Sequence, residues 1–455
     1  MNRTGHPRLR LAVLAAVVGL IVAAASGGVG AGPEPARGDS AVAAETQTPQ
    51  PTTETESADP TGATTTKPAV SVQDGTLPVD AGRVFARVQQ VLGTDVSPPG
   101  YVRVVDEPSG LAPADAAEMA AAPRFWRLVG VASEPALNET ERDQLENGFT
   151  TGLGGIVLYP GTEPTPTTVT PLLAHEYVHY VQFVQKRGVE VSRAVNTRTT
   201  DGQFVRRSVL EGAAVYATDA YVDRYPPASR PNSAWYPQLQ RKLLPGSVSW
   251  YANTAYIFGH RYVADRLDSP RHLSRIYADP PTTSEQVIHG LQPAAEPPVP
   301  LNVTVRSDRT WLSVGTDRLG EAFIRATLAN GVSASRATRG AAGWGNDTLR
   351  IFRSSSRANS SYVWVLRWDD AANATEFESA FTRYLDARGN ESAANGTWRL
   401  RGRTVDVYAP SDRVVVVAFG PRTFVDRLQP SATGSRVVVR IGDDRPMAGE
   451  LVARR

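Results

Sequence analysis

The sequence predicts an α+β fold, with two folded units behind an N-terminal export segment. Helical spacing of apolar residues dominates between residues 81 and 295, with only short strand-like runs between the helices. A Pro-rich stretch at 292–300 interrupts that pattern, and strands alternate with helices beyond it. We therefore divide the chain into residues 1–32, 33–80, 81–295 and 296–455.

The composition is that of a globular protein and excludes several classes. The chain has 455 residues, of which 41% are apolar and 21% charged, enough to bury a sizeable core. Its net charge of +2 provides no concentrated basic surface, so we expect no nucleic-acid partner. The absence of Cys excludes disulfides, thiol catalysis and Cys-ligated metals. Any metal site must therefore use His and carboxylates. Nothing in the sequence indicates the oligomeric state.

Residues 1–32 have the pattern of an export signal. Arg3, Arg8 and Arg10 form a basic start without an acidic residue, and an uncharged apolar run follows up to residue 31. The run is long for a cleaved signal, whose apolar region spans up to about 15 residues, and about 20 residues cross a bilayer. The segment is thus a cleaved signal or a single-helix membrane anchor. Either form places the protein outside the cell, secreted or at the cell surface.

Residues 33–80 are rich in Thr and Pro and predict a disordered stalk or a plain flexible linker. N-glycosylation sequons begin at Asn138, Asn302, Asn346, Asn359, Asn373, Asn390 and Asn395, and six of these lie beyond residue 300. This density favours a glycosylated outer domain in an exported chain, against the alternative that short tripeptides recur by chance.

The first unit is expected to contain helices around an early strand pair. We expect helices at 84–92, about 204–221 and about 252–267, and strands at 101–105 and 156–159. Thr170-Pro171 supplies an N-cap and a proline at the first helical position. The helix that begins there should run to about Arg187, with Gly188 after it.

The second unit is expected to be a small α+β sandwich. We expect helices at 316–328, 375–385 and 423–428, strands at 349–352 and 362–368, and a hairpin of 398–408 with 414–419. This unit has no cluster of His or paired acids. We therefore expect residues 301–455 to be dispensable for metal binding and for catalysis.

The helix after residue 170 contains the motif His175-Glu176-Tyr177-Val178-His179. Two His at i and i+4 stand one turn apart on one face, so both rings reach one ion. Glu176 is about 100° round the helix and faces bound water without being a ligand. Zinc suits such nitrogen and oxygen ligands best. The alternative, two surface His on an amphipathic helix, leaves the N-cap and the upstream strand unexplained.

A third ligand is expected at Glu211, which lies 32 residues after His179 on a second helix. Gly212 and the alanines after it would let this helix pack closely against the first. The alternative is that Glu211 is an exposed helical acid. No His follows the motif within 180–188, which excludes a metzincin.

In these motifs the chain resembles the gluzincin metallopeptidases, especially the aminopeptidase-N-like and peptidase-MA-like groups, over residues 81–295. The matching motifs are His175-Glu176-x-x-His179, Glu211-Gly212-x-Ala214 and Tyr256-Ile257-Phe258-Gly259. The resemblance implies a zincin-like domain in which His175, His179 and Glu211 bind Zn²⁺, Glu176 is the general base and Tyr256 donates to the oxyanion. It also implies that 156–159 is an edge strand that holds an extended substrate.

The chain departs from the family at one position and leaves one role open. Thermolysin-like members carry an Asp four residues after the ligand Glu, where this chain has Val215; Asp219 is a candidate substitute for orienting the first His. Tyr256 is alternatively an ordinary buried aromatic, with Tyr251 or His260 in its role. The layout as a whole resembles a surface protein of a high-salt archaeon, without the strongly acidic composition.

These features predict an exported zinc-dependent peptidase that acts on peptides or proteins. The absence of a Gly-Ala-Met-Glu-Asn-like motif favours an endopeptidase over an exopeptidase. The alternatives are a non-catalytic cell-surface glycoprotein that retains the fold for binding, and a structural zinc site. Glu176 argues against the first, since a binding module has no need of a general base. Three protein ligands argue against the second, because structural zinc is usually four-coordinate.

Overall fold

The computed structural model describes residues 13–14, 70–106, 124–131, 145–151, 154–225, 231–308, 310–354, 357–392 and 396–442. The α+β class is confirmed, because helices and three separate sheets alternate along the chain. Apart from 13–14 and 70–80, the predicted export segment and stalk lie outside the described residues. Within the described part of the chain, no helix is both long enough and apolar enough to cross a membrane.

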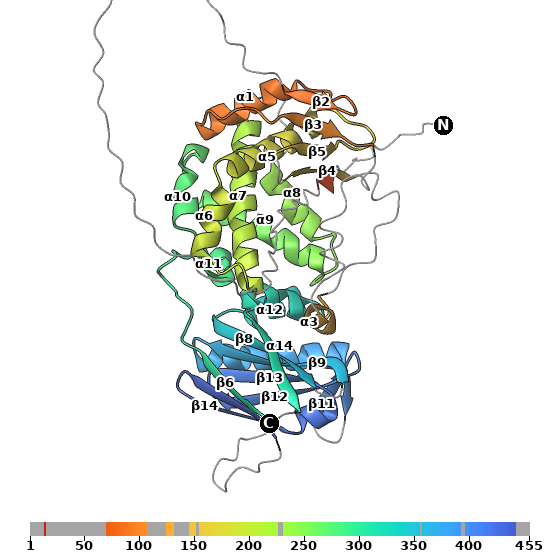
Figure 1. The fold of residues 1–455 in the computed structure, drawn as a ribbon, viewed down its shortest axis with the longest axis vertical. Helices are drawn as coiled ribbons and strands as arrows, with labels where there is room; N and C mark the ends of the chain where they lie inside the picture. The colour runs from red at the N-terminus through yellow and green to blue at the C-terminus, as the bar shows by residue number, and fades with distance from the viewer. Residues whose placement is uncertain are drawn as a thin grey trace, which may run out of the picture.

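A five-stranded sheet with the order β1-β4-β5-β3-β2 lies at one end of the molecule (Figure 1). Its strands are β1 (Val13–Leu14), β2 (Ser71–Gln73), β3 (Tyr101–Val104), β4 (Leu145–Thr150) and β5 (Ile156–Tyr159). The prediction that 156–159 form an edge strand is wrong, because β5 pairs in parallel with β3 and antiparallel with β4. All four residues of β5 are apolar and buried, as suits a central strand.

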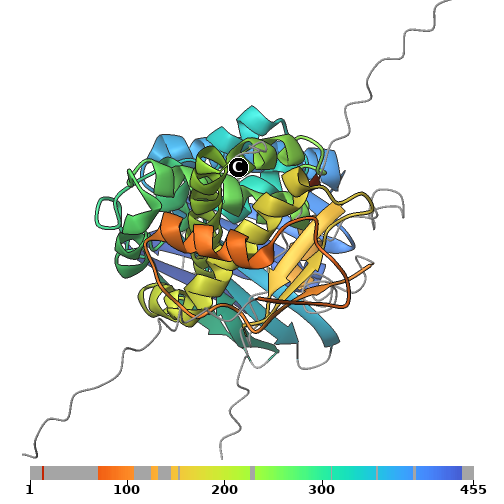
Figure 2. The same ribbon diagram turned by 90° about the horizontal axis from the view of Figure 1, so that it is seen from above.

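Helices form the rest of the first unit. They are α1 (Ala81–Leu92), α3 (Arg124–Leu128), α5 (Pro166–Val184), α6 (Arg187–Ala194), α7 (Thr200–Arg224), α8 (Asn232–Gln240), α9 (Val248–Ala264), the 3₁₀ turn η2 (Pro270–His272), α10 (Ser274–Ala278) and α11 (Ser284–His289). Residues 171–182 of α5 are all buried, so this helix lies inside the unit, in contact with α7 and the sheet. Seen from above in Figure 2, α1 lies across this end of the molecule beside the strands.

Helix α5 begins earlier than predicted. Its N-cap is Thr165, whose side chain accepts from the Thr168 amide in a capping box, so Pro171 lies inside the helix. Thr165-Pro166 presents the same Thr-Pro signal as Thr170-Pro171, and the capping box strengthens the earlier one. The helix also ends early, because Lys186 adopts a left-handed conformation with φ of 56°. The predicted terminator at position 188 therefore falls inside α6.

Helices α7 and α9 cross at unusually short range through two glycines. A Cβ on Gly212 would lie 2.2 Å from the carbonyl carbon of Gly259, and a Cβ on Gly259 would lie 2.0 Å from the carbonyl oxygen of Ser208. Helix α7 contacts the first helix as predicted, but Gly212 does not make that approach possible, because its open side faces α9. The crossing places the turn that precedes Gly212 against the turn that precedes Gly259.

The second unit consists of two sheets and a helical layer. Its elements are β6 (Asn302–Ser307), β7 (Trp311–Asp317), α12 (Gly320–Ala329), α13 (Ala334–Arg339), β8 (Trp344–Ser354), β9 (Arg357–Trp368), α14 (Ala371–Arg388), β10 (Asn390–Ser392), β11 (Thr397–Leu400), β12 (Arg403–Ser411), β13 (Val414–Gly420), α15 (Arg422–Val425), β14 (Leu428–Thr433) and β15 (Arg436–Ile441). The sheets have the orders β10-β11-β12-β13-β9-β8-β7 and β14-β15-β6. Apolar side chains of both sheets form one buried cluster, which packs the two sheets together as a sandwich.

Three predicted elements of this unit differ from the structure. The predicted helix at 423–428 ends at Val425, because Leu428 already pairs with β15 as the first residue of β14. The predicted strand 398–408 is divided into β11 and β12, because Arg401 and Gly402 form a turn with φ of 46° and 79°. The predicted helix at 316–328 begins only at Gly320, because Thr316 and Asp317 still pair with β8.

One continuous apolar core runs through both units. Phe125 of α3 has ring-centroid distances of 5.1 Å to Tyr362, 5.9 Å to Trp364 and 5.3 Å to Phe419, all in the second unit. The Tyr384 hydroxyl of α14 donates to the carbonyl oxygen of Val129 at 2.7 Å. In Figure 1, α3 and α12 lie together at the junction of the two units. The predicted boundary at residue 295 thus separates segments that share a core.

Polar contacts also join the start of α7 to the second unit. The buried Asp201 carboxylate accepts from the Ser284 amide at 2.9 Å and forms an ion pair with Arg318 at 3.1 Å. The neighbouring Thr200 donates from its amide to Asp317 at 2.8 Å. These contacts hold the helix that contains Glu211 to the link between β7 and α12.

Candidate metal centre

The three predicted metal ligands converge. Nε2 of His179 lies 3.0 Å from Nε2 of His175 and 3.1 Å from Oε2 of Glu211, and Nε2 of His175 lies 3.5 Å from that same oxygen. The exposed fractions are 0% for His175 and 3% for both His179 and Glu211. Glu211 is thus buried and faces the two imidazoles rather than solvent.

These separations fit a tetrahedral metal ion. Two ligand atoms at about 2.0–2.1 Å from a tetrahedral Zn²⁺ lie roughly 3.3 Å apart, close to the 3.0, 3.1 and 3.5 Å separations in this cluster. The donor set of two imidazole nitrogens and a carboxylate oxygen also suits zinc. Within the described residues, no other group of three or more such side chains converges in this way.

Gln182 orients the second His. Its amide NH₂ donates to the Leu210 carbonyl at 2.9 Å and to the Tyr277 hydroxyl at 3.0 Å, so its oxygen faces Nδ1 of His179 at 2.8 Å. Nδ1 of His179 must then carry a proton, which leaves the lone pair of Nε2 for a metal in the neutral ring. Gln182 was not among the predicted site residues, although its position one turn after His179 was a usable signal. Nδ1 of His175 has no hydrogen-bond partner among the described residues.

Glu176 is fully buried beside the cluster and has two different oxygens. The Thr150 hydroxyl of β4 lies 3.0 Å from Oε2 of Glu176 and 3.0 Å from its backbone oxygen, and donates toward both. Oε1 makes no hydrogen bond within the described residues. Thr150 was also missed, because only the antiparallel pairing of β4 with β5 brings it to the helix. β4 is therefore the strand that contacts Glu176, through Thr150.

Tyr256 lies near the cluster together with a second tyrosine. Its ring is 6.5 Å from the His175 ring and 4.4 Å from the Tyr236 ring, and both pairs are nearly parallel. The Tyr236 hydroxyl is buried and makes no hydrogen bond within the described residues. Burial and the charge of Glu211 raise the pKa of both phenols well above 10, so both remain protonated donors. Tyr236 comes from α8 and had no signal in the sequence.

The other candidates for supporting roles lie elsewhere. Asp219 accepts from the Ser233 amide and lies 3.6 Å from His260, so the prediction that it orients the first His is wrong. His260 is engaged with Asp219 rather than with the cluster. Tyr251 packs against Trp126, Phe204 and Phe323 at the junction with the second unit. Of the three candidates for the oxyanion role, Tyr256 is the one whose ring contacts a candidate ligand.

The pKa values of the two acids, Glu176 and Glu211, are shifted in opposite directions. Burial raises the pKa of Glu176 to about 7 and lowers that of His175. Burial opposes the charged forms of His179 and Glu211, but their mutual attraction outweighs it. The pKa of His179 is raised to about 9 and that of Glu211 is lowered to about 2. A divalent cation would compete with the proton that these two groups share.

Comparison with known proteins covers part of the second unit. Residues 309–429 match a family described as a domain of unknown function, DUF8575. The match extends from the start of β7 into β14 and contains none of the candidate metal ligands. No curated protein and no solved structure shows significant similarity to the chain.

Proposed function

We propose that this protein is an exported zinc-dependent endopeptidase of gluzincin type, with a zincin-like domain in residues 81–295. The observation that supports the proposal most strongly is the convergence of ligand atoms of His175, His179 and Glu211 within 4.8 Å. Export follows from the basic and apolar pattern of residues 1–32, and places the enzyme at the cell surface or in the medium.

The chemistry divides between the ion and the side chains of the chain. A zinc ion in this site supplies a Lewis acid that lowers the pKa of water and polarises a carbonyl. Glu176 takes the proton of the attacking water on Oε1, the oxygen without a hydrogen-bond partner among the described residues, and delivers it to the leaving amine. Thr150 holds Oε2 in place. Tyr256 donates a hydrogen bond to the oxygen on which negative charge develops.

A second candidate function is supported by the burial of the site. The three ligands are at most 3% exposed, which suits a metal that stabilises the fold of a non-catalytic surface glycoprotein. Glu176 distinguishes the two functions, because a stabilising site does not need a buried carboxylate with an unpaired oxygen.

Metal analysis and peptide hydrolysis with three variants of the full chain test the proposal. We expect His175→Ala to lose bound zinc, and Glu176→Gln to retain zinc while kcat falls by about 10²–10⁴-fold, the usual contribution of a general base. His272→Ala is the matched control, because His272 is exposed and lies outside the cluster. It should retain both zinc and activity.

The results of these measurements distinguish the two candidate functions. Unchanged zinc stoichiometry in His175→Ala would contradict the metal site itself. Zinc binding without peptide hydrolysis in the unmodified chain, combined with a lower melting temperature after zinc removal, would favour the non-catalytic function. Loss of zinc in Glu176→Gln would show that Glu176 is a ligand rather than the base.

A further inference from the structure

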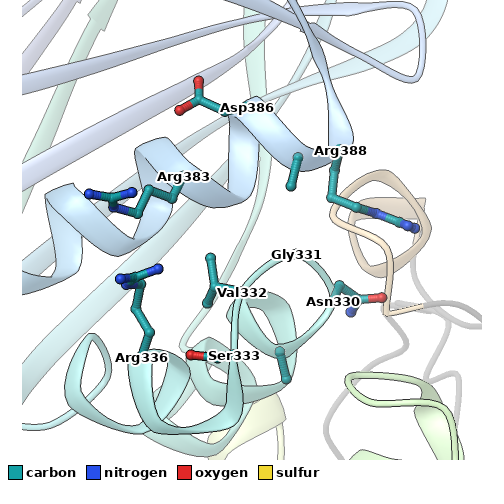
Figure 3. Close-up of a pocket in the computed structure, with 10 residues that line it drawn as sticks. Asn330, Gly331, Val332, Ser333, Arg336, Arg383, Asp386 and Arg388 are labelled. Carbon is teal, nitrogen blue, oxygen red and sulfur yellow. The ribbon is translucent and has the colours of Figure 1, made fainter.

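A pocket of about 690 Å³ opens in the second unit, between helix α14 and the turn that joins α12 to α13 (Figure 3). Its lining residues, 329–333, 336, 383 and 386–388, all fall within the region that matches DUF8575. Three arginines, Arg336, Arg383 and Arg388, line the pocket together with one acid, Asp386. The pocket therefore has an excess of positive charge.

Within the described part of the chain, no acidic side chain neutralises these arginines. Among the described residues, none of the three guanidinium groups forms an ion pair or a hydrogen bond. The Asp386 carboxylate accepts from the Trp398 indole at 2.9 Å. Figure 3 shows this carboxylate directed away from Arg336 and Arg383, whose guanidinium ends lie on the same side of the pocket. By contrast, the nearby Arg325 forms an ion pair with Glu321 at 2.6 Å.

The backbone holds the two walls at a fixed separation. A Cβ on Gly331 would lie 2.9 Å from the Tyr384 ring, and a Cβ on Gly340 would lie 2.6 Å from the Ala380 Cβ. Both ends of the segment that contains Arg336 are thus pressed against α14, the helix that contains Arg383. The Tyr384 hydroxyl bond to Val129 anchors α14 in turn. The backbone segments that bear the two arginines are thus held at a fixed separation before any ligand arrives.

We propose that this pocket binds a tetrahedral oxyanion, a phosphate or sulfate group, between Arg336 and Arg383. Guanidinium groups recognise such oxygens through paired N–H donors. A tetrahedral anion can present one pair of oxygens to Arg336 of α13 and another pair to Arg383 of α14 at the same time. A carboxylate presents its two oxygens to one side only. A dianion also balances the two positive charges of Arg336 and Arg383. The pocket is larger than the anion, which leaves room for the molecule that bears it.

Titration calorimetry on the full chain at low salt tests the site, with inorganic phosphate, sulfate, glycerol phosphate and acetate as probes. We expect saturable binding of the tetrahedral anions and much weaker binding of acetate. Arg336→Gln and Arg383→Gln should each weaken phosphate binding by about tenfold or more, as expected for loss of charge-assisted bonds. The double variant should show no saturable binding. Tighter binding of glycerol phosphate than of inorganic phosphate would identify a phosphomonoester as the ligand; equal binding would identify the free ion.

Arg339→Gln is the matched control, because Arg339 lies on the same helix as Arg336 but is exposed and outside the pocket. It should bind phosphate like the unmodified chain. Phosphate should also raise the melting temperature of the unmodified chain but not that of the double variant. Absence of saturable binding, acetate binding as tight as phosphate binding, or equal loss in Arg339→Gln would each overturn the proposal. The zinc content of these variants should be unchanged, because the site is independent of the metal centre.

Discussion

At the scale of single residues, the two oxygens of Glu176 have different surroundings. Oε2 accepts from Thr150, whereas Oε1 is buried and has no partner within the described residues. A carboxylate fixed through one oxygen keeps the other available for proton transfer, which is the geometry that the proposed reaction needs. Thr150 is therefore a positioning residue for Glu176.

Replacement of Thr150 by Val tests that role without a large change in shape. We expect Thr150→Val to retain zinc and to lower kcat by about tenfold, because a hydrogen bond to a charged group is lost. Thr218→Val is the matched control, because Thr218 is also buried but its hydroxyl has no hydrogen-bond partner. Peptide hydrolysis and metal analysis measure both effects. Equal losses in the two variants would assign the effect to packing.

The two stacked tyrosines give a second prediction at this scale. Tyr256→Phe should retain zinc and lower kcat by roughly 10²-fold or more, as expected for loss of an oxyanion donor. Tyr236→Phe should leave kcat nearly unchanged and preserve the stack, because it removes a hydroxyl without a partner. Steady-state kinetics with separate kcat and KM values distinguish them. The reverse result would assign the oxyanion role to Tyr236.

At the scale of secondary-structure elements, the metal centre depends on two helix contacts. Helix α5 supplies both His and Glu176, while α7 supplies Glu211. The glycine crossing of α7 with α9 brings Tyr256 to the same place, one turn before Gly259. The site therefore requires α7 to contact α5 and α9 simultaneously.

Gly259→Ala tests the importance of the crossing. The added methyl group would lie 2.0 Å from the Ser208 carbonyl oxygen, so the helices must separate. We expect a loss of stability of about 1–3 kcal/mol, typical of overpacking, and weaker zinc binding. Gly82→Ala in α1 is the control, because its new Cβ meets only the Asp80 carboxylate at 3.4 Å. That variant should be stabilised by up to about 1 kcal/mol. Chemical denaturation measures both, and equal effects would contradict the packing argument.

At the scale of the whole molecule, the two units share their core and polar contacts. Phe323, Ile324 and Leu328 of α12 are fully buried, in a helix that contacts α7 and α9. Removal of residues 301–455 would remove α12 and expose to water the apolar surface of α7 and α9 that this helix covers. Residues 301–455 therefore contribute to the stability of the first unit.

We expect calorimetric unfolding of the full chain to show one transition rather than two, because the shared core couples the units. A chain that ends at residue 295 should melt at a lower temperature and bind zinc less tightly. Two well-separated transitions, together with an unchanged melting temperature for the truncated chain, would show that the units fold independently.

Glu285 gives a pH-dependent prediction at the junction of the units. Burial, followed by the nearby charges of Glu321 and Asp369, raises the pKa of Glu285 from about 4.5 to about 9. Since the folded state holds this proton more tightly than the unfolded chain, stability due to this group is full below pH 4.5 and is lost as the pH rises toward 9. Glu285→Gln should remove this loss.

The melting temperature of Glu285→Gln should exceed that of the unmodified chain at pH 8.5, by roughly 2–4 °C for each kcal/mol of relief, and should match it at pH 4.5. Glu376→Gln is the control, because Glu376 is exposed on α14. It should change neither value. A Glu285→Gln variant that is less stable at pH 8.5 would mean that the carboxylate has a stabilising partner.

The mixed fold class, most helices and the three candidate ligands could be predicted from local sequence patterns. Helical periodicity is local, so His175, Glu176 and His179 occupy known positions around one helix once that helix is recognised. Gln182 was equally accessible by this reasoning, because it lies one turn further on the same helix. The Thr-Pro caps were ambiguous, because two copies of one signal stand five residues apart and only the capping box decides between them.

Which distant segments meet could not be predicted and is seen only in the folded chain. In the fold, β4 lies beside Glu176 and Tyr236 stacks on Tyr256. Asp219 faces His260, and α3 packs on the second unit. None of these follows from periodicity, because each joins residues that are separated in sequence and held together by burial of apolar surface. The unpaired arginines of the second-unit pocket belong to the same class. Their charges appear in the sequence, but the absence of neutralising partners among the described residues depends on how the helices pack.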